Sequence, residues 1–172
     1  MLSDKDLKNI CESNGGEWWH TYYRVCFVPD KESMNRVLKD LLLRRNELTN
    51  PLVIEMKIPL EEVENYVEHY VYISKKKIQY GARITRTLLD INTIYSKMLN
   101  ENPYPEKCSI WYDEDYNLMA DCSKSQSEDI SKLKGESDVE KVIRNIFDDF
   151  EKNEREVSNM MKKIESKLES MI

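Results

Sequence analysis

The segment that most constrains the fold runs from Pro59 to Asn100, where apolar side chains recur at alternating intervals of three and four residues. This spacing is typical of a helix with one apolar face directed at a partner. Pro59 suits the first turn of a helix, and Glu61 and Glu62 follow where the helix dipole favours acidic side chains. The pattern weakens around Ser74, Lys77 and Gly81. The sequence therefore predicts either one long helix or two helices joined near Gly81. The apolar positions are Leu60, Val63, Val67, Tyr70, Ile84, Leu88, Ile91, Tyr95 and Met98.

The C-terminal segment 138–172 carries a second apolar repeat, with heptad spacing, and predicts another long amphipathic helix. We expect its apolar side to be a seam that meets a partner. The predicted seam consists of Val139, Ile143, Ile146, Phe150, Val157, Met160, Ile164 and Leu168. The preceding segment 123–137 is polar and rich in serine, without a clear period, which favours a flexible linker.

Two stretches nearer the N-terminus favour strands. Residues 17–28 are mostly aromatic or β-branched, and residues 52–58 alternate between apolar and polar from Ile54 onward. Helices are predicted over residues 4–12, capped by Ser3, and over residues 31–48, capped by Asp30. The second of these would connect the two strands, which could then pair in parallel with a right-handed crossover.

The four cysteines fall into two pairs of similar spacing, Cys11 with Cys26 and Cys108 with Cys122. Neither pair has the short Cys-x-x-Cys spacing of a zinc knuckle, so we predict two disulfides. A zinc site built from Cys11, Cys26 and His20 is the alternative for the first pair.

Residues 108–122 indicate a β-hairpin, because two apolar stretches flank the polar turn 114–117. Pairing Tyr112 with Leu118 brings Cys108 directly opposite Cys122. Opposed residues of an antiparallel pair have Cβ atoms about 5 Å apart, which a disulfide can bridge.

Composition narrows the function classes. The net charge of −6 argues against a protein that binds nucleic acid over its whole surface, but it leaves room for a local basic patch. No stretch approaches the roughly twenty apolar residues of a membrane helix, and the N-terminus lacks the pattern of a secretory signal. These features predict a cytoplasmic protein without a membrane partner. Disulfides in that compartment point to a hyperthermophilic archaeon or one of its viruses.

One basic segment stands out in this acidic chain. Five cations lie within twelve residues, and a tyrosine between them could stack on a base. The candidate nucleic-acid contacts are Lys75, Lys76, Lys77, Tyr80, Arg83 and Arg86. A solvated basic face, balanced by neighbouring acids, is the alternative interpretation.

Other polar and aromatic groups fit no catalytic motif. His20 and His69 have no paired nucleophile or second metal ligand at helical spacing. The acids at 113–115 fit a solvated turn at least as well as a pair of catalytic carboxylates. Strand alternation would bury one aromatic ring of each neighbouring pair at 18–19 and 22–23. We therefore predict no catalytic residue, cofactor or metal.

Together these patterns predict an α+β protein, mostly helical, in which a small disulfide-supported sheet and a β-hairpin accompany two long, coiled-coil-like amphipathic helices. Its parts would be an α+β domain over 1–122, a linker over 123–137 and a helix over 138–172. The leading hypothesis is a non-enzymatic interaction or scaffolding protein that forms a homo-oligomer or docks a protein partner through these helices. The alternative is a nucleic-acid-binding regulatory or replication accessory protein that uses residues 75–86. A small hydrolase is the third hypothesis.

Overall fold

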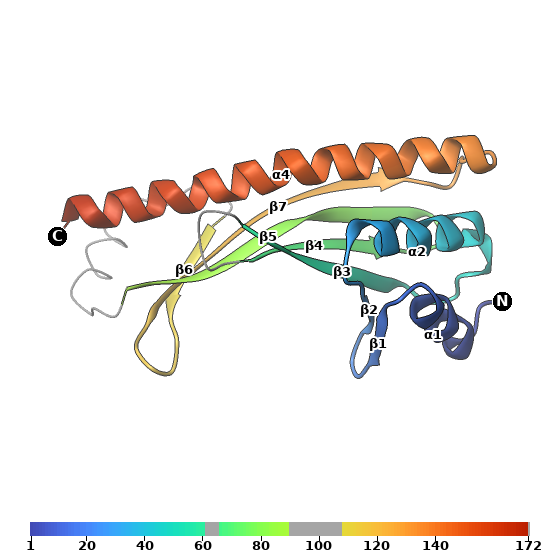
Figure 1. Ribbon diagram of the computed structural model, residues 1–172, viewed down its shortest axis with the longest axis horizontal. Helices are drawn as coiled ribbons and strands as arrows, with labels where there is room; N and C mark the ends of the chain where they lie inside the picture. Colours follow the sequence, from blue (N-terminus) through green and yellow to red (C-terminus); the bar gives the residue numbers. More distant parts are fainter. Residues whose placement is uncertain (61–65, 90–107, 172) are drawn as a thin grey trace.

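A seven-stranded sheet in the order β1-β2-β3-β4-β5-β7-β6 forms the centre of the protein (Figure 1). The computed structural model describes residues 1–60, 66–89 and 108–171, and all statements about structure refer to these residues. Every neighbouring pair of strands is antiparallel except β2 and β3, which are parallel. The strands are β1 (Glu17–His20), β2 (Arg24–Phe27), β3 (Leu52–Pro59), β4 (Tyr66–Ile73), β5 (Lys77–Leu89), β6 (Cys108–Tyr112) and β7 (Leu118–Asp129).

The described helices pack on one face of this sheet. They are α1 (Asp4–Ser13), α2 (Lys31–Leu43), the short 3-10 helix η1 (Arg45–Glu47) and α4 (Glu136–Met171). Figure 1 shows α4 running along the length of the sheet, whereas α1 and α2 lie at the end nearer the N-terminus. None of the helices within the described ranges is both long and apolar enough to cross a membrane.

The long helix predicted over residues 59–100 is wrong, because strands β4 and β5 occupy most of the described part of this segment. In β4, Val67, His69, Val71 and Ile73 are buried and alternate with more exposed neighbours. This period of two belongs to a strand with one covered face. Residues 61–65 and 90–100 of the predicted helix lie outside the described residues. The protein is thus not mostly helical with two long helices, but a mixed sheet with a single long helix, α4, among the described elements.

The flexible linker predicted over 123–137 is also wrong in its first half. Strand β7 continues to Asp129 and pairs with β5 from Lys77 to Leu89. Its serines 123, 125 and 127 alternate with residues that face α4, so a polar composition here reflects a strand whose other face meets water. A turn at residues 130–135 then leads directly into α4.

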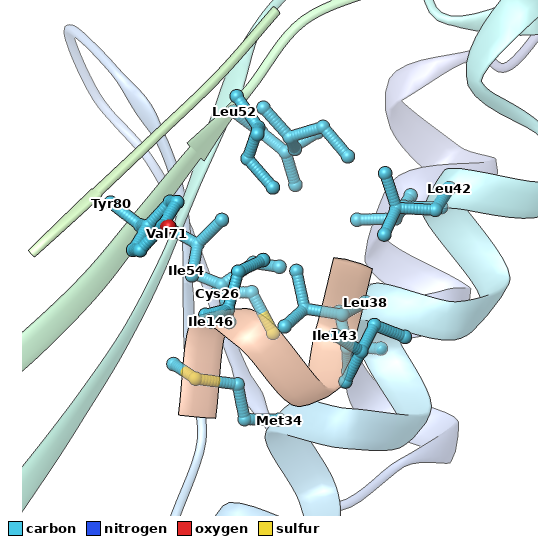
Figure 2. Close-up of a cluster of buried hydrophobic side chains, with 14 of the residues drawn as sticks. Cys26, Met34, Leu38, Leu42, Leu52, Ile54, Val71, Tyr80, Ile143 and Ile146 are labelled. Carbon is cyan, nitrogen blue, oxygen red and sulfur yellow. The ribbon is translucent and has the colours of Figure 1, made fainter. Parts of the chain in front are cut away.

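The apolar side of α4 covers the sheet of its own chain. Seven of the eight seam residues predicted to meet a partner are buried there, and Met160 is partly buried, while Met161 is fully buried. The contacts form two hydrophobic clusters. The first joins α1, α2 and the N-terminal half of α4 to the sheet, and the second joins the C-terminal half of α4 to β4, β5, β6 and β7. Figure 2 shows side chains of the first cluster, including Met34, Leu38 and Leu42 of α2, Ile143 and Ile146 of α4, and Leu52, Ile54, Val71 and Tyr80 of the strands.

Predictions that depend on local signals are confirmed. Ser3 caps α1 and Asp30 caps α2 through side-chain oxygens that accept backbone N–H groups. The two disulfides Cys11–Cys26 and Cys108–Cys122 form, and the 108–122 hairpin has the predicted register. The strand predicted over 17–28 is instead two strands, β1 and β2, joined by residues 21–23.

Candidate interaction surface

The face of the sheet opposite the helices is called the open face here, because no described helix lies on it. Its side chains are the alternate strand residues that point away from the buried clusters. Strand β1 is also an edge strand, with β2 as its neighbour in the described sheet.

Two rows of side chains cross the open face at the β1–β2 end. The register aligns Trp19, Val25, Val53 and Tyr72 across four neighbouring strands and forms an apolar row. The next row aligns Glu17, Phe27, Glu55 and Tyr70 in the same way. Residues aligned on neighbouring strands have Cβ atoms about 5 Å apart, so each row is a continuous strip of contacting side chains.

The β1–β2 hairpin forms the walls of a groove at the edge of this face. The groove has a volume of about 480 Å³ and is lined by Glu17, Trp19, Thr21, Tyr23, Val25 and Phe27. Its aromatic rings are exposed to an unusual degree, since Trp19 is 51% exposed and Tyr23 is 75% exposed. Tyr22, at the hairpin tip, is 94% exposed. Clustered exposed aromatic side chains mark surfaces that bind other molecules.

The hairpin is held firmly against α1. Cys26 of β2 forms its disulfide with Cys11 of α1, and Arg24 of β2 donates a hydrogen bond of 2.6 Å from Nε to Oδ1 of Asp4. This hydrogen bond is the main reason that the pKa of Asp4 lies below its usual range. Gly16 passes so close to the disulfide that an added Cβ would lie 2.7 Å from Cys26 Sγ. The groove is therefore preorganised on a rigid base.

Two carboxylates of the second row have no cationic partner within the described residues. Neither Glu17 nor Glu55 forms a salt bridge there, and the two cations nearest Glu55, Lys57 and Arg83, both pair with Glu68. Burial raises the pKa of the half-buried Glu55, and the negative charge of Glu68 raises it further. Arg83 and Lys57 lower it, but not enough to offset these effects. An acidic, partly desolvated position of this kind favours a cation.

The residues predicted to contact nucleic acid are not brought together. Lys75, Lys76 and Lys77 lie at or beside the β4–β5 turn and are exposed, whereas Tyr80 is buried and donates a hydrogen bond of 2.7 Å to Asp149. Arg83 lies on the open face, while Arg86 points to the opposite side and pairs with Glu165 of α4. A single surface made of these six residues does not form.

The two histidines and the acids of the β6–β7 turn make contacts typical of structural residues. His69 is fully buried beside Phe150, and the nearest side-chain carboxylate is that of Glu154. His20 lies 3.7 Å from Asp4 on the protein surface. Asp113 accepts backbone N–H groups of Asp115 and Asn117 and so stabilises the β6–β7 turn. No cluster of three or more His, Cys, Asp or Glu residues suited to a metal occurs in the described part of the chain.

Comparison with protein-family models, with curated proteins and with solved structures finds no match to this chain. The candidate surface therefore depends on the geometry alone. Strand alternation predicts one buried ring in each neighbouring pair, and Trp18 beside the exposed Trp19 is indeed partly buried against the core. The prediction is wrong for Tyr22 and Tyr23, which lie between the strands and are both exposed. Sequence reasoning missed Val53, Glu55 and Tyr72. The alternation in residues 66–73 is the signal that could have placed Tyr72 on a strand.

Proposed function

We propose that the protein is a non-enzymatic interaction module that docks a protein partner on its open face, with the aromatic groove of the β1–β2 hairpin as the centre of the contact. The observation that supports this most strongly is the pair of exposed rings in the groove, that of Trp19, which belongs to the apolar row, and that of Tyr23. Aromatic side chains dominate the energetically important centres of protein interfaces. The amphipathic helices do not serve this role, because their apolar sides are buried.

The dimensions of the open face fit such a contact. Strands lie about 4.8 Å apart and advance about 3.3 Å per residue, so a face of seven strands that average about eight residues covers roughly 800 Å². That area is about what one partner contributes to a standard protein interface. The outer edge of β1, which pairs with no further strand among the described residues, also allows an extended segment of the partner to join the sheet.

Affinity capture from extract of the source organism tests this proposal. The baits are the wild-type chain, a Trp19→Ser/Tyr72→Ser variant, and a Tyr116→Ser control whose exposed ring lies on the β6–β7 turn. We expect a protein that is retained by the wild type and the control but lost at least tenfold with the double variant. Equal capture by all three baits would contradict docking on the open face. Light scattering of the pure chain shows whether a second copy is the partner.

A second candidate function is binding of nucleic-acid phosphates at a lysine cluster, defined as Lys75, Lys76, Lys132 and Lys134. The backbone N–H of Ile130 donates a 2.9 Å hydrogen bond to the carbonyl of Lys76, which holds the two lysine-bearing turns together. All four side chains are exposed and form no salt bridge with a described residue. Lys75 and Lys76 also line a groove of about 300 Å³ with Thr49 and Asn50.

Fluorescence anisotropy with labelled single-stranded and double-stranded DNA tests the lysine cluster. Binding through phosphates should weaken linearly on a log–log plot against salt concentration. Lys75→Glu/Lys76→Glu should abolish the binding, and the control Lys163→Glu on the exposed side of α4 should not. Binding that is absent at low salt, or unchanged in the double variant, would eliminate this candidate.

A further inference from the structure

We infer that the open face holds a recognition site for an arginine side chain of the partner, with the ring of Phe27 as the platform and the carboxylates of Glu17 and Glu55 as acceptors on either side. This inference rests on the proposed docking function and names the chemistry that the docked segment must supply.

The strand register creates the required geometry. Phe27 of β2 is aligned with Glu17 of β1 on one side and with Glu55 of β3 on the other. All three side chains point to the open face. Cys26 and Ile54, the chain neighbours of Phe27 and Glu55, are fully buried on the helix side, and Trp18, the neighbour of Glu17, packs against the core. Neighbouring Cβ atoms about 5 Å apart place one carboxylate on each side of the ring.

A guanidinium group fits this arrangement better than an ammonium group. It is planar, stacks on an aromatic face and directs five N–H donors outward in its plane. A group stacked on Phe27 can donate to both Glu17 and Glu55 at once. A lysine has no planar face to stack, so its single charged nitrogen cannot make the same set of contacts.

Both carboxylates are available to an incoming cation. Lys57 Nζ lies 3.7 Å from Oε1 of Glu68, and Arg83 also bonds to Glu68, so the local cations are engaged in the next row. Glu55 is half-buried and Glu17 is exposed. An arginine would compensate the partly desolvated charge of Glu55, which no described residue contacts as a salt-bridge partner.

The neighbouring row predicts the residue that accompanies the arginine. Glu17 and Trp19 are two positions apart on β1 and face the same side. A segment added to the β1 edge presents every second side chain to this side at the same spacing. An arginine beside Glu17 therefore places an apolar residue, two positions away, against Trp19. The expected motif in an extended segment is Arg-x-Val when the segment runs parallel to β1 and Val-x-Arg when it runs antiparallel, with another apolar residue allowed in the place of Val.

Peptide titration followed by backbone amide NMR tests the inference on the full chain. The probes are acetyl-Thr-Arg-Thr-Val-Thr-amide and acetyl-Thr-Val-Thr-Arg-Thr-amide, one for each strand direction, and the comparison peptides carry citrulline or lysine in place of arginine. Citrulline keeps the shape of the side chain and removes its charge. We expect saturable shifts at Glu17, Phe27 and Glu55 with the arginine peptide, and binding at least about tenfold weaker with either comparison peptide, which corresponds to about 1.4 kcal/mol.

Matched variants locate the site. Glu55→Gln should weaken the arginine peptide about tenfold, toward the affinity of the citrulline peptide, whereas Glu114→Gln on the β6–β7 turn should leave it unchanged. The arginine site would be overturned if the arginine and citrulline peptides bound with equal affinity, or if Glu55→Gln left tight binding unchanged. It would also be overturned if the shifts were confined to other strands, or if no shift occurred. None of these outcomes would contradict the docking proposal, because capture of a partner through Trp19 and Tyr72 does not require an arginine contact. The affinity-capture experiment tests that proposal separately.

Discussion

The imidazole Nε2 of His69 lies 3.6 Å from a carboxylate oxygen of Glu154, in a layer between the two hydrophobic clusters. His69 is fully buried, and its ring lies 4.6 Å from that of Phe150, measured between centroids. Asn153, also fully buried, precedes Glu154 on α4. Neither ring nitrogen of His69 forms a hydrogen bond with a described protein atom. This polar layer separates the part of the core under α2 from the part under the C-terminal half of α4.

The burial of His69 predicts a loss of stability in mild acid. Burial lowers the pKa of this histidine to about 4 in the folded protein, with a smaller contribution from the charge of Lys31. The unfolded chain, with an ordinary pKa of about 6.5, therefore binds more protons between these two values. The free energy of unfolding should fall by up to about 3 kcal/mol as the pH drops from about 6.5 to about 4. Urea denaturation at several pH values measures this loss.

Two variants separate this effect from general acid denaturation. His69→Gln should flatten the pH dependence over the same range, whatever its effect on stability at pH 7. Glu154→Gln should steepen it, because burial raises the pKa of Glu154 and its protonation in the folded state opposes the histidine effect. If the wild type and His69→Gln lose stability in parallel, His69 does not carry the pH dependence.

The variant Phe150→Ala tests whether the apolar side of α4 stabilises its own chain by packing on the sheet. Phe150 is 1% exposed and packs against Tyr80 and Phe147 as well as His69. Its truncation should lower the free energy of unfolding by about 3–5 kcal/mol and leave the solution mass unchanged. The control, Met160→Ala, removes a partly buried side chain of the same helix and should have a smaller effect. If light scattering showed a change of mass in Phe150→Ala without a loss of stability, the apolar side of α4 would instead be a contact between two chains.

Parts of the fold follow from short-range signals. A hairpin register needs only the turn and its flanking residues, which is why the alignment of Cys108 with Cys122 could be predicted. Helix caps are equally local, and Ser3 and Asp30 carry side chains that accept N–H groups from the first turn. Strand alternation also predicted that one of Trp18 and Trp19 is buried, and it is Trp18 that packs against the core.

The error over β4 and β5 has a geometric cause. Val67 and Val71 are four residues apart, as are Ile84 and Leu88, and an interval of four lies close to one helical turn while also returning to the same side of a strand. Only the residues between these positions distinguish a helix from a strand. The buried His69 obscured the strand alternation, because histidine is not a typical core residue. The two rows of the open face could not be predicted either. They require the register of β2 with β3, which α2 separates in the sequence, and of β3 with β4, which the sequence reasoning assigned to a helix.

Gly81 has a packing role that Gly81→Ala should reveal. The sequence predicted a joint between two helices near Gly81, whereas the structure places this glycine within β5, close to the backbone of β7. An added Cβ would collide with the backbone oxygen of Lys124 and lie 2.9 Å from Cα of Ser125. We expect the substitution to destabilise the protein by roughly 3 kcal/mol or more, because the clashing atoms belong to backbone and cannot rotate away. Thermal and urea denaturation measure the loss.

Gly135→Ala is the comparison for Gly81→Ala. Gly135 has a φ of +85° but no atom within 4 Å of an added Cβ, so only its backbone conformation opposes a side chain. Its replacement should cost about 1–2 kcal/mol. Equal losses in the two variants would contradict the close approach of β7 to Gly81.

The two disulfides should contribute similarly to stability but differently to binding. Their sequence separations are 15 and 14 residues, so by the chain-entropy model each stabilises the fold by about 3 kcal/mol. Cys11–Cys26 joins α1 to the hairpin that forms the aromatic groove, whereas Cys108–Cys122 joins β6 to β7 at the other end of the sheet. Cys11→Ser/Cys26→Ser should therefore weaken both partner capture and arginine-peptide binding, at a temperature where the variant is still folded. Cys108→Ser/Cys122→Ser should lose comparable stability and keep both. Loss of binding in both variants, or in neither, would show that the link between α1 and the hairpin does not preorganise the groove.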